Sequence, residues 1–206
     1  MKIFDSGMPE ESYWNSLFDV DAIVDWLALP KGRERVIVEI GCGYGTFTVP
    51  IARSSAARVY AFDIEPSMID IAQGNAHKAG LSNVIFRLRD VLAQGSGLES
   101  VTVDRVLLFN ILHFSERRVL LAEAARILKT GGMVCIIHWR KDIPTPRGPA
   151  LDSRPDQGQL LRAAAGLDLG FHDNSKVLAP YHWGMQLVKK EEAGHEIRDH
   201  HPDQPA

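Results

Sequence analysis

The sequence predicts an α/β fold: a doubly wound, mostly parallel sheet with helices on both faces. Two observations support this fold class. Short, continuously apolar runs alternate with stretches of helical periodicity through most of the chain. Apolar strands separated by helices are typical of a parallel sheet that is buried on both sides. A length of 206 residues suits one such domain with a full core.

The first elements are expected from their apolar spacing. Residues 10–29 have a helical pattern. Its apolar anchors are Trp14, Leu17, Phe18, Ile23, Trp26 and Leu27. A short, continuously apolar strand is expected at 36–40, a short helix at 46–54 and a second strand at 59–64.

The middle of the chain continues the alternation. A helix is expected over 66–79, because Pro66 stands in its first turn and Gly80 at its end, where these residue types are favoured. Two strands follow at 84–88 and 103–109, the second largely apolar.

The next helix and strand are marked by residues at their ends. Ser115 is a candidate N-cap for a helix over 116–129. Gly131 and Gly132 stop that helix, and a fifth strand is expected over 133–138.

The last part of the chain is less regular. A loop rich in Pro and Arg is expected over 140–156, a short helix over 157–165, and a hairpin-like strand pair at 175–179 and 182–189. Residues 1–189 are therefore interpreted as one domain, with 10–29 as an N-terminal lid. The polar segment 190–206 is expected to be a flexible tail.

Composition excludes several classes of function. A net charge of −3 gives no general electrostatic case for binding nucleic acid or an anionic membrane. Cys42 and Cys135 lie in or beside apolar runs, which indicates buried thiols in a reducing compartment. No signal pattern and no membrane-length apolar run is evident, so a cytoplasmic protein is expected. No metal is expected, since His195, His200 and His201 stand in the polar tail.

The run that follows the first strand is the most informative motif. It reads Glu39-Ile-Gly-Cys-Gly-Tyr-Gly45, with three glycines at alternate positions. Glycine lets the backbone approach a small cofactor closely, because it has no Cβ. The G-x-G-x-G spacing favours S-adenosylmethionine. A dinucleotide fingerprint requires G-x-G-x-x-G, and Thr46 stands at its third glycine position.

Further motifs follow in order at the expected strand ends. Asp63 ends the second strand, Asp90 ends the third, Asp104-Arg-Val-Leu-Leu-Phe-Asn-Ile-Leu-His113 spans the fourth, and Leu128-Lys-Thr-Gly-Gly-Met133 leads into the fifth. With the glycine run, they make residues 10–140 resemble the class I S-adenosylmethionine-dependent methyltransferases. The resemblance implies a Rossmann-like seven-stranded sheet whose last strand is antiparallel, and S-adenosyl-L-methionine as the cofactor.

The resemblance also implies which residues contact the cofactor. Asp63 would accept hydrogen bonds from the two ribose hydroxyls. Asp90 would accept one from the adenine amine, between Ile64 and Met68. Glu39 would face the ammonium group. The expected cofactor-binding residues are Glu39, Gly41, Cys42, Gly43, Gly45, Asp63, Ile64, Met68, Asp90, Val91, Asn110 and Ile111.

Catalysis in this family consists mainly of holding the nucleophile, the methyl group and the sulfur in line. A base is needed only where the nucleophile must lose a proton. His113 and His138 are the candidates, because both follow strand ends and histidine titrates near neutrality; a structural role is the alternative for each. The fourth-strand motif lacks the Asn/Asp-Pro-Pro-aromatic pattern, which argues against a nucleic-acid base or glutamine substrate.

The acceptor side is expected in the loop after the fifth strand. Arg140, Arg147 and Arg154 stand there with Trp139, and could clamp a carboxylate or phosphate of a small-molecule substrate. The alternative is a solvated loop whose arginines pair with neighbouring acids. Tyr13 and Trp14 could close the site from the N-terminal segment, or could instead anchor that segment in the core.

Two other functions remain open from the sequence. An NAD-dependent oxidoreductase would share the sheet and the glycine turn, but Thr46 and the lack of a Tyr-x-x-x-Lys pair disfavour it. A non-catalytic module that binds S-adenosylmethionine is not excluded by any sequence feature. Nucleic-acid and membrane partners are not expected, and the oligomeric state is left open.

Overall fold

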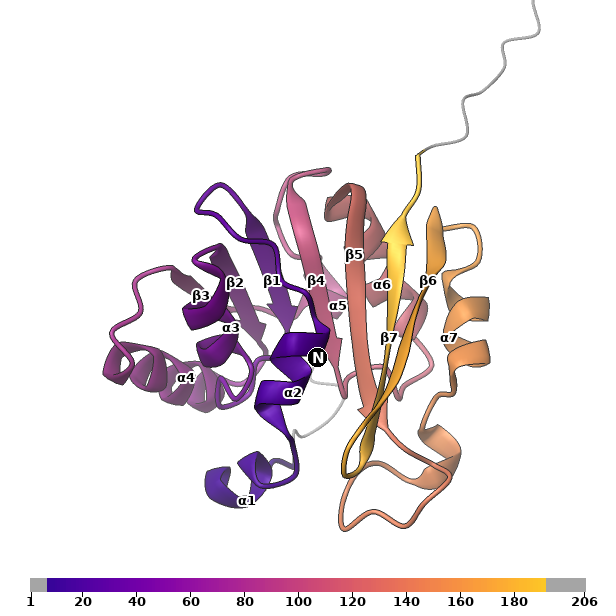
Figure 1. Ribbon diagram of the computed structural model, residues 1–206, viewed down its shortest axis with the longest axis horizontal. Helices are drawn as coiled ribbons and strands as arrows, with labels where there is room; N and C mark the ends of the chain where they lie inside the picture. The colour runs from indigo at the N-terminus through magenta and orange to yellow at the C-terminus, as the bar shows by residue number, and fades with distance from the viewer. Residues whose placement is uncertain (1–6, 192–206) are drawn as a thin grey trace, which may run out of the picture.

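The computed structural model describes residues 7–191, which form a seven-stranded sheet in the order β3-β2-β1-β4-β5-β7-β6 (Figure 1). Every pairing is parallel except those of β7, which runs antiparallel to both β5 and β6. The predicted fold class is therefore confirmed. The strands are β1 (Val36–Ile40), β2 (Arg58–Asp63), β3 (Val84–Leu88), β4 (Val103–Phe109), β5 (Leu128–Trp139), β6 (Leu169–Leu178) and β7 (His182–Lys189).

Helices cover both faces of this sheet. Buried side chains of α2, α3 and α4 pack on one face, and those of α5, α6 and α7 on the other. The helices are α1 (Glu11–Asn15), α2 (Val20–Trp26), α3 (Thr48–Ser55), α4 (Pro66–Lys78), α5 (Val91–Gln94), α6 (Arg117–Ile127) and α7 (Gln157–Ala164), with a 3₁₀ turn, η1 (Leu151–Ser153). No helix of the described residues is long and apolar enough to cross a membrane.

The N-terminal segment differs from the single helix that its periodicity predicts. It forms two short helices, because Asp19 caps α2 by accepting a hydrogen bond from the Ala22 N–H at 3.0 Å. Glu10 caps α1 in the same way. The anchors Leu17, Phe18, Ile23, Trp26 and Leu27 are buried as expected, and Trp14 is partly buried. The apolar spacing therefore identified the buried face but not the break between the helices.

Other boundaries also move. β5 begins at Leu128, which pairs with Val103 before a bulge, so the predicted fifth strand starts too late. β6 begins at Leu169, ahead of the expected start, because its N-terminal half pairs with the end of β7. The sequence did not predict the short helix α5, which Asp90 caps. Of the predicted tail, residues 192–206 lie outside the described residues, with His195, His200 and His201 among them.

The order of strands reverses between β1 and β4, which are neighbours in the sheet. In open α/β sheets, ligands bind beyond the carboxyl ends of the strands at this switch point. In Figure 1, α1 and the loop after β5 both lie at the edge where the parallel strands end. The glycine loop after β1 and Asn110 after β4 meet at the same edge.

Candidate active site

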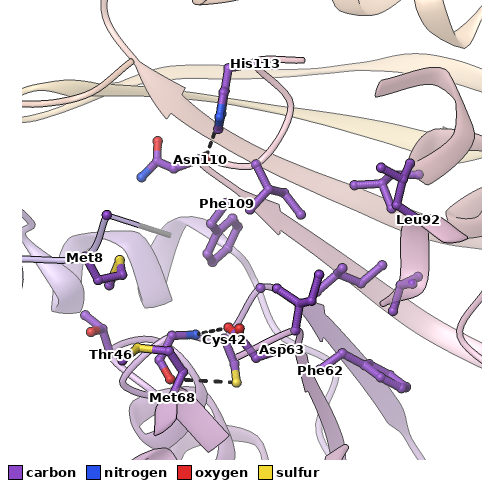
Figure 2. A pocket seen from close by; sticks show the side chains of 18 of the residues that line it. Met8, Cys42, Thr46, Phe62, Asp63, Met68, Leu92, Phe109, Asn110 and His113 are labelled. Atoms are coloured by element: carbon purple, nitrogen blue, oxygen red, sulfur yellow. Dashed lines mark hydrogen bonds between the residues drawn. The ribbon is translucent and has the colours of Figure 1, made fainter. Parts of the chain in front are cut away.

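A cavity of about 610 Å³ lies at this edge of the sheet. Its volume falls in the range of roughly 300–1,000 Å³ that is typical of small-molecule sites. All the predicted cofactor-binding residues line it except Glu39 and Gly45. Figure 2 shows Asn110 and His113 on one side of this cavity, with Cys42, Asp63 and Met68 across from them.

The glycine loop turns back on the end of β2. The N–H groups of Gly41 and Cys42 both donate to the Phe62 carbonyl, at 2.8 and 2.9 Å. Gly41 has a φ of +81°, and a Cβ there would lie 2.9 Å from Ile111 Cγ2, so a side chain is excluded. Gly45 does not line the cavity, because it faces α4: a Cβ there would lie 3.3 Å from the Ala72 Cβ.

Asp63 is held by two backbone donors. Its Oδ2 accepts from the Gly43 N–H at 2.8 Å and its Oδ1 from the Glu65 N–H at 3.0 Å. Only 8% of the residue is exposed, and burial raises its pKa although these hydrogen bonds oppose the shift. Each oxygen keeps a lone pair, so the held carboxylate can accept further hydrogen bonds from a ligand in the cavity.

Glu39 lies beneath the glycine loop and does not reach the cavity wall. Alternation along β1 directs it toward α3, where it accepts a hydrogen bond from the Thr48 hydroxyl. Its Oε1 is buried and has no hydrogen-bond partner among residues 7–191. Burial raises the pKa of Glu39 to about 8, so it holds a proton at neutral pH.

Residues that follow β2 and β3 form the part of the cavity wall beyond Asp63. Ile64, Met68 and Val91 provide apolar wall, and Asp90 lines the cavity while its Oδ1 caps α5. Arg89 also lines it and was missed by sequence reasoning. Its guanidinium donates to the carbonyls of Gln94 and Gly95, so it orders the end of α5.

Asn110 directly follows β4 and has an unusual conformation. Its φ is +57°, which side-chain-bearing residues rarely adopt. Both amide atoms, Oδ1 and Nδ2, are buried without a hydrogen-bond partner among the described residues. Buried polar atoms are nearly always paired, so this amide on the cavity wall indicates a bound ligand.

The two candidate bases have different surroundings. His113 lines the cavity, its Nδ1 lies 3.2 Å from the Asn110 carbonyl oxygen, and burial lowers its pKa. His138 does not reach the cavity: β5 extends to Trp139, so His138 faces the α5–α7 side of the sheet and is fully buried. Burial lowers the pKa of His138 to about 3, which keeps its ring neutral.

Aromatic rings form another part of the cavity wall. Trp14 and Trp139 line it with ring centroids 6.4 Å apart, and Phe47 and Phe109 meet edge to face at 5.0 Å. Phe114 also lines the cavity, beside His113. Sequence reasoning named the two tryptophans for this end and missed the three phenylalanines, which resemble ordinary core residues in apolar runs.

The three loop arginines separate in the structure. Arg147 lines the cavity and donates to the Gly7 carbonyl. Arg140 does not, because it pairs with Asp142 at 2.6 Å. Arg154 is only 5% exposed and turns away into the loop, where it donates to backbone carbonyls.

The N-terminal segment closes the cavity, with Gly7 and Met8 in its wall. Tyr44 donates to the Pro9 carbonyl at 2.5 Å, and the Thr46 hydroxyl to Asn15 at 2.7 Å. Tyr13, predicted for this site, is 41% exposed and does not line the cavity. No pattern in the sequence marks Gly7 and Met8, because they precede the periodic segment.

The sequence around this cavity matches a known protein family. A family model described as a methyltransferase domain matches residues 37–132, which contain the glycine loop, Asp63, Asp90 and Asn110. Residues 37–132 therefore form a methyltransferase domain. The sequence-based recognition is confirmed, as is S-adenosylmethionine as the cofactor.

Individual relatives of this domain differ in what they act on. A ribosomal protein L11 methyltransferase of Syntrophomonas wolfei is 33% identical over 103 residues, 50% of this chain and 32% of the relative. The chain thus matches only about a third of the length of the first such relatives. Among solved structures, an S-adenosylmethionine-dependent methyltransferase from Aquifex aeolicus has a TM-score of 0.74 at 21% identity, covering 87% of this chain and 94% of that one.

A geranyl diphosphate C-methyltransferase from Streptomyces coelicolor, solved with S-adenosyl-L-homocysteine, has a TM-score of 0.68 at 18% identity and covers 89% of this chain and 84% of that one. At such identities the structural matches establish the methyltransferase fold alone. The cavity itself suits the cofactor, because the excluded Cβ at Gly41, the anchored Asp63 carboxylate and the unpartnered Asn110 amide all face the same space.

Proposed function

We propose that this methyltransferase transfers the methyl group of S-adenosylmethionine to a small-molecule acceptor that carries a carboxylate or phosphate. The observation that carries the proposal is one continuous cavity with two chemically different ends. One end has the glycine loop, Asp63 and Asp90, and the other has aromatic rings and Arg147.

The residues at the first end would orient the cofactor. Asp63 would accept hydrogen bonds from the ribose hydroxyls, and Asp90 from the adenine amine between Ile64 and Met68. Asn110 and Ile111 would lie beneath the sulfonium. When bound, the cofactor supplies an activated methyl group, so these residues need only orient it.

His113 is the proposed base where the acceptor must lose a proton. A hydrogen bond from Nδ1–H to the Asn110 carbonyl leaves the acceptor lone pair on Nε2. Burial lowers the pKa of His113, so the ring is neutral at physiological pH and can take up a proton. His138 supports this site only from within the sheet, with its ring centroid 6.1 Å from that of His113.

The walls of the acceptor end favour a small molecule over a macromolecule. Gly7 from the N-terminal segment and Gly148 and Pro149 from the loop after β5 line this end, while Met8 of the same segment lies over Gly43 of the glycine loop. Arg147 joins the two segments by its hydrogen bond to Gly7. A folded protein or an RNA helix would have to displace these segments to reach the sulfonium.

Calorimetric titration with S-adenosylmethionine and S-adenosylhomocysteine tests the cofactor site. We expect both to bind with one site per chain, and absence of binding at millimolar concentration to folded protein would contradict the proposal. Transfer of a labelled methyl group into a whole-cell extract, separated afterwards into metabolites, protein and RNA, then distinguishes a methyltransferase from a non-catalytic binding module. Label that appears only in protein or RNA would reject the small-molecule acceptor.

A further inference from the structure

The acceptor end of the cavity is built over a buried cation. Arg154 follows η1 and is 5% exposed. Its guanidinium donates to the carbonyl oxygens of Arg140 at 2.5 Å, Pro149 at 2.9 Å and Arg147 at 3.3 Å. No carboxylate of the described residues forms an ion pair with it. A buried charge without a counter-charge is costly, so this arginine needs a compensating role.

The hydrogen bonds of Arg154 organise the loop that carries Arg147. The Arg154 guanidinium lies 5.9 Å from the centre of the Trp139 ring, and Gly148 packs on that ring so closely that a Cβ would lie 2.9 Å from it. Arg154 thereby holds the backbone on both sides of Gly148 against Trp139. The Arg147 side chain leaves this braced loop toward the cavity.

Positive charge at this end is not balanced by acidic groups in the cavity wall. The acids among the described lining residues are Asp63 and Asp90, and both belong to the cofactor end. Of the acids in the loop, Asp142 is paired with Arg140, Asp156 is paired with Lys141, and the exposed Asp152 does not line the cavity. The bound cofactor would add a further positive sulfonium, so an acceptor with a negative charge is favoured electrostatically.

The shape of the walls adds a second requirement. The Trp14 ring is partly exposed at this end, with the buried Trp139 behind it at an interplanar angle of 65° and Phe47 also in the wall. Such walls favour a flat ring, which aromatic side chains contact by stacking or edge-to-face packing. Because a single guanidinium, that of Arg147, faces this end, the planar two-oxygen geometry of a carboxylate suits it better than a phosphate dianion.

We propose that the acceptor is an aromatic carboxylate whose ring lies against Trp14, which the buried Trp139 supports from behind, and whose carboxylate binds Arg147. Arg154 is a positioning residue that braces the Arg147 loop on Trp139 and adds positive potential. This inference rests on the proposed function, because it assigns the acceptor end of the same cavity.

Calorimetry on protein saturated with S-adenosylhomocysteine tests the inference. The probes are benzoate, cinnamate and 2-naphthoate, each compared with its neutral alcohol, and cyclohexanecarboxylate as the non-aromatic acid. At least one aromatic acid should bind about tenfold or more tighter than its alcohol and than cyclohexanecarboxylate. Equal affinities for acid and alcohol, or for aromatic and saturated acid, would overturn the proposal.

Variants separate the two arginines. Arg147→Met should remove the preference for acid over alcohol, while Arg140→Met, in the same loop but paired with Asp142, should keep it. Arg154→Met should reduce that preference and leave S-adenosylhomocysteine binding unchanged, with partial rescue by Arg154→Lys. If Arg154→Met does not fold, Arg147→Met still decides, since retention of the preference contradicts the assignment.

The first titration distinguishes this inference from the function on which it depends. If S-adenosylhomocysteine does not bind to the wild-type protein, the proposed function itself fails. If it binds and the probes show no preference for aromatic acids, the cofactor site stands and the acceptor assignment alone is wrong.

Discussion

The Oδ2 atom of Asp63 accepts a hydrogen bond of 2.8 Å from the backbone N–H of Gly43, so the end of β2 positions the loop that follows β1. One carboxylate thus shapes the glycine loop and offers its remaining lone pairs to the cavity. The two strands that pair in parallel, β1 and β2, are joined at their carboxyl ends by this contact as well as by the sheet.

Asp63→Ala should weaken binding of S-adenosylmethionine by about 1.5–3 kcal/mol, the scale of a hydrogen bond to a charged group. Isothermal titration calorimetry measures the change. Asp70→Ala, an exposed aspartate on α4, is the control and should leave the dissociation constant unchanged. A dissociation constant for Asp63→Ala equal to that of the wild type would reject the role.

Asn110 allows its backbone and side-chain contributions to be separated. Asn110→Gly removes the unpartnered amide but accepts the φ of +57°, so it should weaken cofactor binding with little loss of stability. Asn110→Ala removes the same amide and should also lower the free energy of unfolding by about 1–2 kcal/mol. Thermal unfolding and calorimetry of both variants test this. Equal stability of the two would show that the backbone conformation is not strained.

The sequence predicted well which residues line the first end of the cavity, because each of them is tied to a strand end. Asp63, Asp90 and Asn110 follow β2, β3 and β4 in turn, and a parallel sheet brings such positions to one edge. The glycine spacing identified the loop, but it did not show which of its glycines line the cavity and which pack on a helix. Gly45 faces Ala72 of α4, a contact that depends on how the helix packs.

The acceptor end was harder to predict, because it is formed by segments without a strand register. Residues 140–156 are held by side-chain-to-carbonyl hydrogen bonds of Arg154, and the sequence could not show that Arg154 turns inward while Arg147 turns to the cavity. The position of His138 depended on where β5 ends. One further residue of strand placed it on the opposite face from Trp139.

Glu39 should make the stability of the protein fall as pH rises. Its pKa is raised to about 8 in the folded state, so between about pH 4.5 and 8 the folded protein holds a proton that the unfolded chain has lost. The contribution of Glu39 to the free energy of unfolding therefore decreases through this range, by at most about 1.4 kcal/mol per pH unit. Asp63, whose pKa is also raised by burial, contributes with the same sign.

Glu39→Gln should flatten this dependence in urea unfolding measured from pH 5 to 8, while the Thr48 contact is kept by the amide oxygen. The residual slope should combine the contribution of Asp63 with the opposite contributions of the histidines whose pKa values are lowered by burial. A variant that retains the full wild-type slope would show that Glu39 is ionised in the folded protein.

His182 should destabilise the protein in acid. Its ring stacks on Phe18 at 4.4 Å and lies 4.2 Å from Trp139, and burial lowers its pKa to about 3. Below the ordinary histidine pKa the unfolded chain gains a proton that the folded protein does not, so stability is lost as pH falls from about 6.5 toward 3.

His182→Phe keeps the ring stacking and removes the titrating group. The free energy of unfolding of the variant, relative to that of the wild type, should therefore be about 2 kcal/mol higher at pH 5 than at pH 7. His138 has the same lowered pKa and should account for part of the remaining acid sensitivity. Chemical unfolding at the two pH values measures the difference. Parallel losses for variant and wild type would place the acid sensitivity elsewhere.

Two glycines provide a matched test of packing. Gly184 in β7 lies against Trp26 of α2, and a Cβ there would stand 2.6 Å from Cη2 of that buried ring. Gly184→Ala should therefore lower the free energy of unfolding by about 1–3 kcal/mol, the cost of overpacking a core. Gly74 in α4 has open space where a Cβ would stand, so Gly74→Ala should raise stability by about 0.5–1 kcal/mol. Urea unfolding of both variants measures the two effects. Opposite signs for the same chemical change would show that α2 is pressed on β7 at this point, and equal effects would contradict it.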